Sequence, residues 1–196
     1  MQTNWPALAA ARWQLQPRTA FHIDGGAVGS VATAHVPALH RWAKWIAQDA
    51  RGLHLVAPAA GRDDALAEMN EHLRGEGLIV AWRDETFALY EPASGAVLAT
   101  FERAACRFWG TLTRGAHCNG FVAGADGRPT HLWIARRSNT KATDPGKRDN
   151  LIGGGVPHGQ TPLETLVREG WEEAGLTQDQ MVAAKAGRII RIDCDV

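Results

Sequence analysis

Residues 154–176 read GGVPHGQTPLETLVREGWEEAGL, and this stretch decides the fold of the second part of the chain. Its first half has the glycines of a loop, because residues without a Cβ let the backbone turn tightly and come close to a ligand. A helix is predicted to follow, with Thr161 as N-cap, Pro162 at the first helical position and Glu164 completing a capping box. Gly175 is predicted to end the helix.

The predicted helix has two unlike faces. Its apolar face, expected to pack on a sheet, carries Leu163, Leu166, Val167, Gly170 and Ala174. Glu169, Glu172 and Glu173 gather on the opposite side, which an ordinary solvated acidic face would also explain. Like charges three or four residues apart cost about 0.2–0.5 kcal/mol per pair, however, and carboxylates in a last turn oppose the helix dipole. Because Mg²⁺ and Mn²⁺ take oxygen ligands, the three glutamates are the predicted metal ligands.

The stretch resembles the Nudix box, Gly-x5-Glu-x7-Arg-Glu-U-x-Glu-Glu-x-Gly-U, in which U is a bulky aliphatic residue. Seven residues fall on its fixed positions without a gap: Gly154, Arg168, Glu169, Glu172, Glu173, Gly175 and Leu176. Two positions depart, since Gln160 replaces the first Glu and Gly170 the first aliphatic residue. The resemblance implies a Nudix fold and a metal-dependent diphosphate hydrolase. It assigns Glu172, Glu173 and Arg168 to the catalytic set, with Arg168 pairing with a carboxylate and orienting the helix.

A basic segment precedes this stretch. Five cations lie within thirteen residues: Arg136, Arg137, Lys141, Lys147 and Arg148. An ordinary basic surface loop is one interpretation. We favour diphosphate binding by Arg137 and Lys141, with the backbone at Gly154 close to the ligand, since Arg is a bidentate fork for phosphate oxygens and Lys a point charge. The Arg-x-x-x-Lys pattern is also seen in isopentenyl-diphosphate isomerases, but their catalytic cysteine is replaced by Gly153 here.

The expected fold class is α+β, with an α-β-α sandwich in the second part. We expect a small α+β domain over residues 1–112 and an incomplete Nudix domain over 113–196. Helices are predicted for Pro37–Ala50 and from Asp63 or Asp64 to Gly75, and strands for Gly52–Ala57, Leu78–Trp82, Thr86–Tyr90, Val97–Phe101, Cys118–Ala123, Thr130–Arg136 and Arg188–Ile192. Trp42, Trp45 and Trp82 are interpreted as core residues, with a stacking platform for a ring as the alternative.

Residues 81–105 resemble the DUF4743-like domain that precedes the Nudix domain in the thiamine-pyrophosphokinase-related Nudix hydrolases. This resemblance implies hydrolysis of thiamine diphosphate, or of its oxidised analogues, to the monophosphate and phosphate. Two other functions stay open. One is a non-catalytic binding module that keeps the fold without turnover, and the other is a hydrolase of nucleoside-diphosphate derivatives.

Composition limits the partners. The chain carries 21 basic and 21 acidic residues, a balance that favours no nucleic-acid or anionic-membrane surface. With three widely spaced cysteines and neither a signal peptide nor a long apolar run, the sequence predicts a cytoplasmic protein with reduced thiols. Only twenty residues follow Leu176. A Nudix fold that is incomplete there would expose a sheet edge or apolar face, which would favour a homodimer, aggregation or loss of activity.

Overall fold

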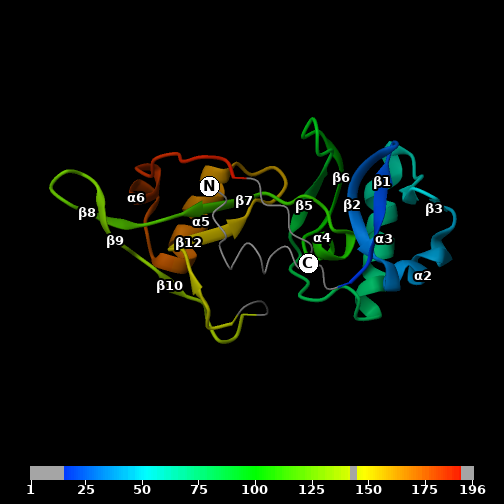
Figure 1. Ribbon diagram of the computed structural model, residues 1–196, viewed down its shortest axis with the longest axis horizontal. Coiled ribbons are helices and arrows are strands. Elements are labelled where there is room, and N and C mark those ends of the chain that lie inside the picture. The colour runs from blue at the N-terminus through cyan, green and yellow to red at the C-terminus, as the bar shows by residue number, and fades with distance from the viewer. Residues whose placement is uncertain (1–15, 142–144, 191–196) are drawn as a thin grey trace, which may run out of the picture. The chain divides into compact units, whose positions relative to one another are not determined.

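The computed structural model describes residues 16–141 and 145–190. The chain divides into two compact units, unit 1 within residues 1–113 and 189–196, and unit 2 within residues 114–188. The predicted mixed α+β class is confirmed, because helices and several small sheets make up the described residues (Figure 1). Each unit is described by itself.

Unit 1 is built on a four-stranded sheet with the order β2-β1-β4-β3. Its strands are β1 (Arg18–Ile23), β2 (Gly26–Ala32), β3 (Ile46–Asp49) and β4 (Gly52–Leu55). Strand β1 pairs antiparallel with β2 and parallel with β4, and β3 pairs antiparallel with β4. The parallel pair requires a crossover, and the segment between β2 and β3 supplies it with the short helices η1 (Thr33–His35), α2 (Val36–Leu39) and η2 (His40–Trp42).

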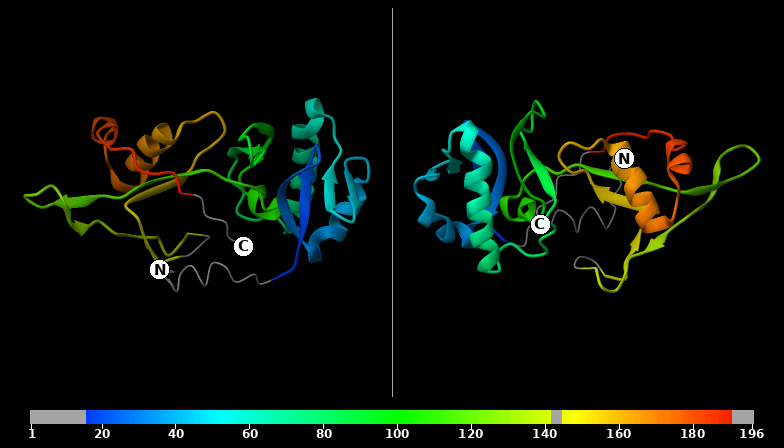
Figure 2. Two further views of the ribbon diagram at one scale, coloured as in Figure 1. Left: turned by 45° about the horizontal axis from the view of Figure 1, so that its top comes forward. Right: turned by 180° about the vertical axis from the view of Figure 1, so that it is seen from behind.

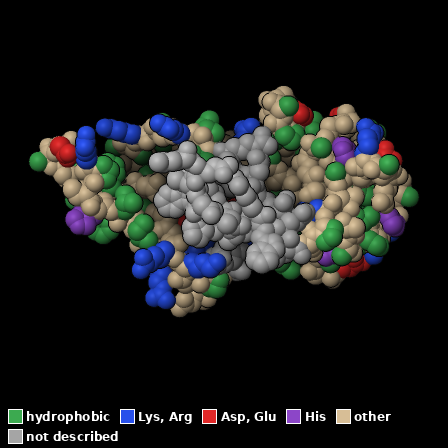
Figure 3. Space-filling view, in the orientation of Figure 1, with side chains coloured by type: hydrophobic (Ala, Val, Ile, Leu, Met, Phe, Trp, Pro, Cys, Tyr) green, Lys and Arg blue, Asp and Glu red, His purple; other side chains and the backbone are tan. Residues whose placement is uncertain are grey.

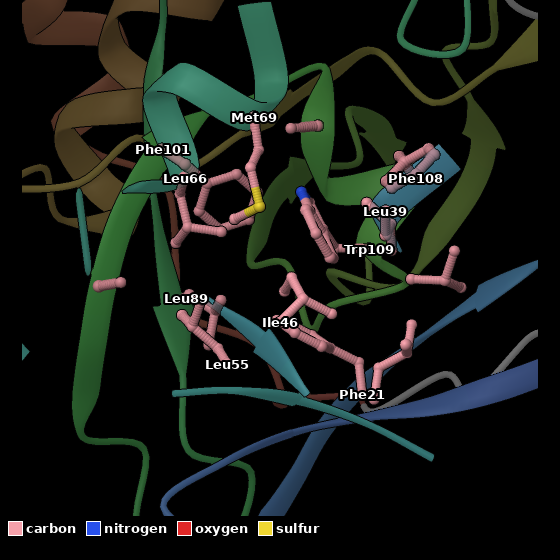
Figure 4. Packing of buried hydrophobic residues seen from close by; sticks show 14 of the residues in the cluster. Phe21, Leu39, Ile46, Leu55, Leu66, Met69, Leu89, Phe101, Phe108 and Trp109 are labelled. Atoms are coloured by element: carbon pink, nitrogen blue, oxygen red, sulfur yellow. The ribbon is translucent and has the colours of Figure 1, made fainter. Parts of the chain in front are cut away.

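A long helix and a hairpin complete unit 1. After η3 (Ala59–Gly61) come α3 (Arg62–Gly75), the antiparallel pair β5 (Thr86–Tyr90) and β6 (Val97–Glu102), and the short α4 (Ala105–Trp109). Both views in Figure 2 show α3 lying along the four-stranded sheet. Apolar side chains from the sheet, α3, β5 and α4 form one core, including Phe21, Leu66, Met69, Leu89 and Trp109 (Figure 4). Burial of such side chains contributes about 1.5–3 kcal/mol each.

The predicted helix over Pro37–Ala50 is wrong in its second half. The helical turns end at Trp42, and Ile46–Asp49 forms strand β3, in which Ile46 pairs with Leu55. Leu39, Trp42 and Ile46 are all buried, so the apolar spacing identified core positions. Strand pairing with β4 overrides the helical period there, because it satisfies the backbone groups of a segment that the core already holds.

The predicted strand over Leu78–Trp82 is also wrong. The backbone N–H groups of Leu78 and Ile79 both donate to the Leu73 carbonyl, closing the end of α3. Ala81 then takes a positive φ of 61°, which a strand does not allow. The predictions for the α3 helix and for the β5–β6 hairpin are confirmed, and the predicted Gly52–Ala57 strand ends at Leu55.

Unit 2 consists of strand pairs and two helices. Its elements are β7 (Gly115–Cys118), β8 (Phe121–Ala123), β9 (Pro129–Leu132), β10 (Ala135–Arg136), β11 (Arg148–Asp149), β12 (Ile152–Gly155), α5 (Pro162–Ala174) and α6 (Gln178–Val182). The pairs are β7–β12, β8–β9 and β10–β11, all antiparallel. The predicted hairpin is confirmed in β8–β9, although the predicted strand over 130–136 breaks between β9 and β10. Residues 188–190 are not a strand, and the rest of the predicted Arg188–Ile192 strand lies outside the described residues.

No helix within 16–141 and 145–190 is both long enough and apolar enough to cross a membrane. The cytoplasmic location stays a prediction.

Cys106 provides a test of the core of unit 1. It is 6% exposed, and burial raises the pKa of its thiol to about 11. Because the folded-state pKa exceeds the unfolded one, the folded state holds the proton where the unfolded state loses it. The contribution of the Cys106 thiol to the free energy of unfolding is therefore fully present below pH 9. It is expected to fall by about 1.4 kcal/mol per pH unit between pH 9 and pH 11. Urea titrations across this range measure the slope, which Cys106→Ala should reduce. Equal slopes in the parent and in Cys106→Ala would contradict the assignment.

Candidate active site

Helix α5 begins and ends as its sequence predicts. The Thr161 Oγ1 accepts from the Glu164 N–H at 3.2 Å, and Glu164 Oε2 accepts from the Thr161 N–H at 2.7 Å, which confirms the capping box. Hydrogen bonds from Thr161 hold the pKa of Glu164 below its ordinary value. Gly175 takes the left-handed conformation at φ 65° and ends the helix. The box residues are thus held on a helix fixed at both ends.

The stretch before α5 is a strand as well as a loop. Sequence reasoning expected only a glycine loop, but Ile152–Gly155 forms β12, with Gly154 opposite Ala116 of β7. Glycine is depleted in strands, so this element had no propensity signal. The one sequence signal for a strand is the apolar residue Ile152 directly before the glycines. The structure buries this side chain completely, at 0% exposed.

The face of α5 that meets this strand is not the predicted one. Leu163 is 48% exposed, whereas Glu169 is only 9% exposed. A Cβ on Gly154 would lie 2.6 Å from Glu169 Cγ and closer still to its carboxylate. The predicted apolar face is therefore only partly buried: Gly170 is buried against Met181, Leu166, Val167 and Ala174 are half-buried, and Leu163 is exposed. The strand instead meets Glu169, for which the missing side chain of Gly154 makes room between helix and strand.

Arg168 joins two of the three predicted metal ligands. Its Nη2 lies 2.9 Å from Glu169 Oε1, and its Nη1 donates to Glu172 Oε2 at 3.3 Å. The prediction that Arg168 pairs with a carboxylate is confirmed. Burial raises the pKa of Glu169, and the Glu172 and Glu173 carboxylates raise it further against the opposing charge of Arg168. Three negative charges therefore act on one another at this face of α5.

Glu173 connects the helix to the strand and to the basic segment. Its Oε2 accepts from the Gly153 N–H at 3.1 Å, and its Oε1 lies 3.8 Å from Lys141 Nζ. Lys141 is thus brought to the carboxylates, as a diphosphate-binding role requires. An anion bound beside Glu173 would have this ammonium within reach.

Arg137, by contrast, is engaged elsewhere. Its Nη1 donates to Asp149 Oδ2 at 2.7 Å, and its backbone N–H donates to the Lys147 carbonyl. These bonds fasten the β10–β11 pair. Figure 3 shows Lys and Arg side chains gathered on the surface of this part of unit 2. The structure brings Lys141 to the glutamates and leaves Arg137 paired with Asp149, so substrate binding by Arg137 stays a prediction.

The donor set suits a hard divalent cation. Glu169, Glu172 and Glu173 offer carboxylate oxygens alone, which Mg²⁺ and Mn²⁺ prefer, and Gly154 supplies the space that one of them occupies. In the arrangement shown, within the residues that the structure describes, no three His, Cys, Asp or Glu side chains form a ready-made metal cluster. The three glutamates as metal ligands stay a prediction.

Sequence reasoning missed one supporting residue, Met181 of α6. A Cβ on Gly170 would lie 2.7 Å from Met181 Sδ, and Met181 is 2% exposed. The Nudix box has an aliphatic residue at the position of Gly170. Because Gly170 has no side chain, α6 packs closely against α5 at this position. A second capping box, formed by Thr177 and Gln180, starts α6 and was readable in the sequence.

Comparison with known proteins agrees with the division into two units. Residues 6–113 match the domain of unknown function DUF4743, and residues 114–188 match the NUDIX domain. Two Arabidopsis thaliana proteins named Nudix hydrolase 20, chloroplastic, and Nudix hydrolase 24, chloroplastic, are each 36% identical over 135 residues, 67% of this chain and 36% of theirs. A Saccharomyces cerevisiae protein named Uncharacterized protein YJR142W is 37% identical over 98 residues, 50% of this chain and 28% of its own.

The chain thus spans about a third of the length of its plant relatives. The DUF4743 match alone covers more than half of the chain, and the match to the NUDIX domain includes the whole box from Gly154 to Leu176. The chain therefore belongs to the DUF4743 family, in which this domain is here followed by a NUDIX domain homologous to those of Nudix hydrolases.

Proposed function

We propose that the chain is a hydrolase that splits a diphosphate linkage with the help of Mg²⁺ or Mn²⁺. The observation that carries the proposal is the joint position of Glu169, Glu172 and Glu173 on α5, with Lys141 3.8 Å from the last of them. A bound divalent cation would neutralise phosphate charge and lower the pKa of a water ligand. Similarity to Nudix hydrolases supports the same reaction class.

The residues of the chain have separate tasks in this proposal. Glu169, Glu172 and Glu173 hold the cation, and Lys141 binds a non-bridging oxygen of the diphosphate. Arg168 keeps two of the carboxylates oriented through its ion pairs. In the overall reaction water adds to one phosphorus, the bridging P–O bond breaks, and a monophosphate and orthophosphate leave.

The proposed substrate is thiamine diphosphate or one of its oxidised analogues. It rests on the resemblance of residues 81–105 to the domain found in thiamine-related Nudix hydrolases, and is consistent with the DUF4743 match over residues 6–113. Nucleoside-diphosphate derivatives are the alternative substrates, because the box fixes the reaction centre and leaves the organic group open.

A phosphate-release screen tests the proposal. The chain is incubated with a diphosphate library that includes oxothiamine diphosphate and nucleoside diphosphates, with Mg²⁺, with Mn²⁺ and with EDTA. We expect orthophosphate and the thiamine-type monophosphate only in the presence of metal. Orthophosphate release from nucleoside diphosphates alone would show that the substrates are nucleoside-diphosphate derivatives and not thiamine-type diphosphates. Binding of the library compounds without turnover would overturn the hydrolase in favour of a non-catalytic binding module.

A homodimer remains part of the proposal. The β8–β9 region of unit 2 exposes several large apolar side chains, namely Phe121, Val122, Leu132, Trp133 and Ile134. Large exposed apolar patches mark association sites. Light scattering of the chain and of a Leu132→Ser/Trp133→Ser variant measures the effect, with a dimer expected only for the parent.

A further inference from the structure

Unit 1 contains a cleft that the proposed reaction does not use. It has a volume of about 450 Å³ and lies between α3 and the β5–β6 hairpin, where Ala67, Thr86 and Phe101 line it. The volume is within the range of about 300–1,000 Å³ that small-molecule sites occupy. Five carboxylates also line it: Asp63, Asp64, Glu71, Asp84 and Glu102. No lysine or arginine is among the described residues of the lining, although Arg74 lies at its edge, 3.7 Å from Glu71, so the carboxylates outnumber the cations at the cleft and favour a positively charged ligand.

A buried amide in the lining points to a ligand. Asn70 lines the cleft and is 0% exposed. Its Oδ1 accepts from Trp109 Nε1 at 2.8 Å, and the indole nitrogen of Trp109 is visible among the core residues in Figure 4. Because an indole N–H only donates, the amide oxygen must face Trp109. Asn70 Nδ2 is then left, within the described residues, without a hydrogen-bond partner, although such groups are nearly always paired.

The carboxylates do not form a site for a metal ion. Asp63 accepts from the Thr100 backbone N–H at 2.8 Å and from its Oγ1 at 2.7 Å. Glu102 accepts from the Arg83 and Glu85 backbone N–H groups. With these oxygens engaged, and no metal cluster among the described residues, the charge is spread along the walls. Spread charge suits a cation that is itself large and delocalised.

An aromatic ring completes the wall. Trp82 is half-buried, its Nε1 donates to Asp84 Oδ1 at 2.9 Å, and the Arg74 guanidinium carbon lies 4.5 Å from the centre of its ring. The ring thus already holds one planar cation on its face.

We propose that this cleft binds a small organic cation with a flat ring and a hydrogen-bond acceptor. Asp64 and Glu71 face the positive charge, with Glu71 shared between the ligand and Arg74, whose Nη1 lies 3.7 Å from Glu71 Oε2. Trp82 offers apolar contact, and Asn70 Nδ2 donates to the acceptor. The site lies wholly within unit 1 and does not depend on the hydrolase proposed for unit 2, so either can fail without the other.

Calorimetric titrations of the whole chain with three related compounds distinguish recognition of the positive charge from recognition of the hydrogen-bond acceptor. The first, 1-methylnicotinamide, is a ring cation with an amide acceptor; nicotinamide is its neutral counterpart, and N-methylpyridinium lacks the acceptor. We expect 1-methylnicotinamide to bind at least about tenfold more tightly than either, because one hydrogen bond or ion contact to a charged group is worth that factor. Affinity for the cations should fall as salt rises.

Two variants place the binding in the cleft. Asp64→Asn/Glu71→Gln should weaken 1-methylnicotinamide by about tenfold or more, whereas Glu68→Gln, on the same helix outside the lining, should leave it unchanged. Asn70→Asp keeps the acceptor for Trp109 and should abolish the preference over N-methylpyridinium. Equal binding of nicotinamide and its methylated cation, no binding of any probe at millimolar concentration, or an unaffected Asp64→Asn/Glu71→Gln variant would each overturn the proposal.

Discussion

Glu173→Gln is expected to lower kcat/KM for metal-dependent phosphate release by at least about a hundredfold, which is about 2.7 kcal/mol of transition-state stabilisation. The amide oxygen still accepts from the Gly153 N–H, which Glu173 does now at 3.1 Å, so helix and strand stay joined. What disappears is a negative charge among three carboxylates. Initial rates at saturating Mg²⁺, with circular dichroism to verify folding, measure this.

Glu164→Gln is the matched control for Glu173→Gln. Glu164 lies on the same helix, but its Oε2 accepts from Thr161 in the capping box, a task that a glutamine oxygen also performs. We expect its rate to equal that of the parent. If Glu173→Gln releases phosphate as fast as Glu164→Gln, the metal role of Glu173 is wrong.

Gly154→Ala is expected to remove activity and to lower the free energy of unfolding of unit 2 by about 1–3 kcal/mol. The new methyl group would overlap the buried Glu169 side chain, which is only 2.6 Å away at Cγ. The backbone conformation of Gly154 in strand β12 is one that alanine also adopts. The loss of stability therefore measures only the close approach of the strand to the helix. Urea unfolding and phosphate release measure the two consequences.

Two further variants separate stability from catalysis at this contact. Gly187→Ala meets no atom within 4 Å and should change neither quantity. Adding Glu169→Ser to Gly154→Ala frees the space, so stability should return while activity stays absent. Activity that returns together with stability would show that Glu169 is a packing residue only.

Local rules predicted the helix of the site well. Thr161, Pro162, Glu164 and Gly175 define the ends of α5 through bonds between residues at most five apart, and such bonds depend on local sequence alone. The spacing of Arg168 and Glu172 likewise predicts their i, i+4 ion pair.

The face that α5 buries was not predictable in this way. Hydrophobic periodicity favoured the Leu163 side, but Glu169 is buried because Gly154, fifteen residues earlier, has no side chain. The same holds for β3, where pairing with β4 decides the conformation of Ile46–Asp49. Both outcomes depend on partners that are distant in sequence, which a period within one segment does not contain.

The central claim is that three glutamates of α5 hold the divalent cation that carries a diphosphate. Titration of the chain with Mn²⁺, followed by electron paramagnetic resonance of the free ion, tests it without any substrate. We expect Mn²⁺ binding by the parent and its loss in a Glu169→Gln/Glu172→Gln/Glu173→Gln variant that remains folded. Equal Mn²⁺ binding by the two proteins, or no binding by the parent, would contradict it.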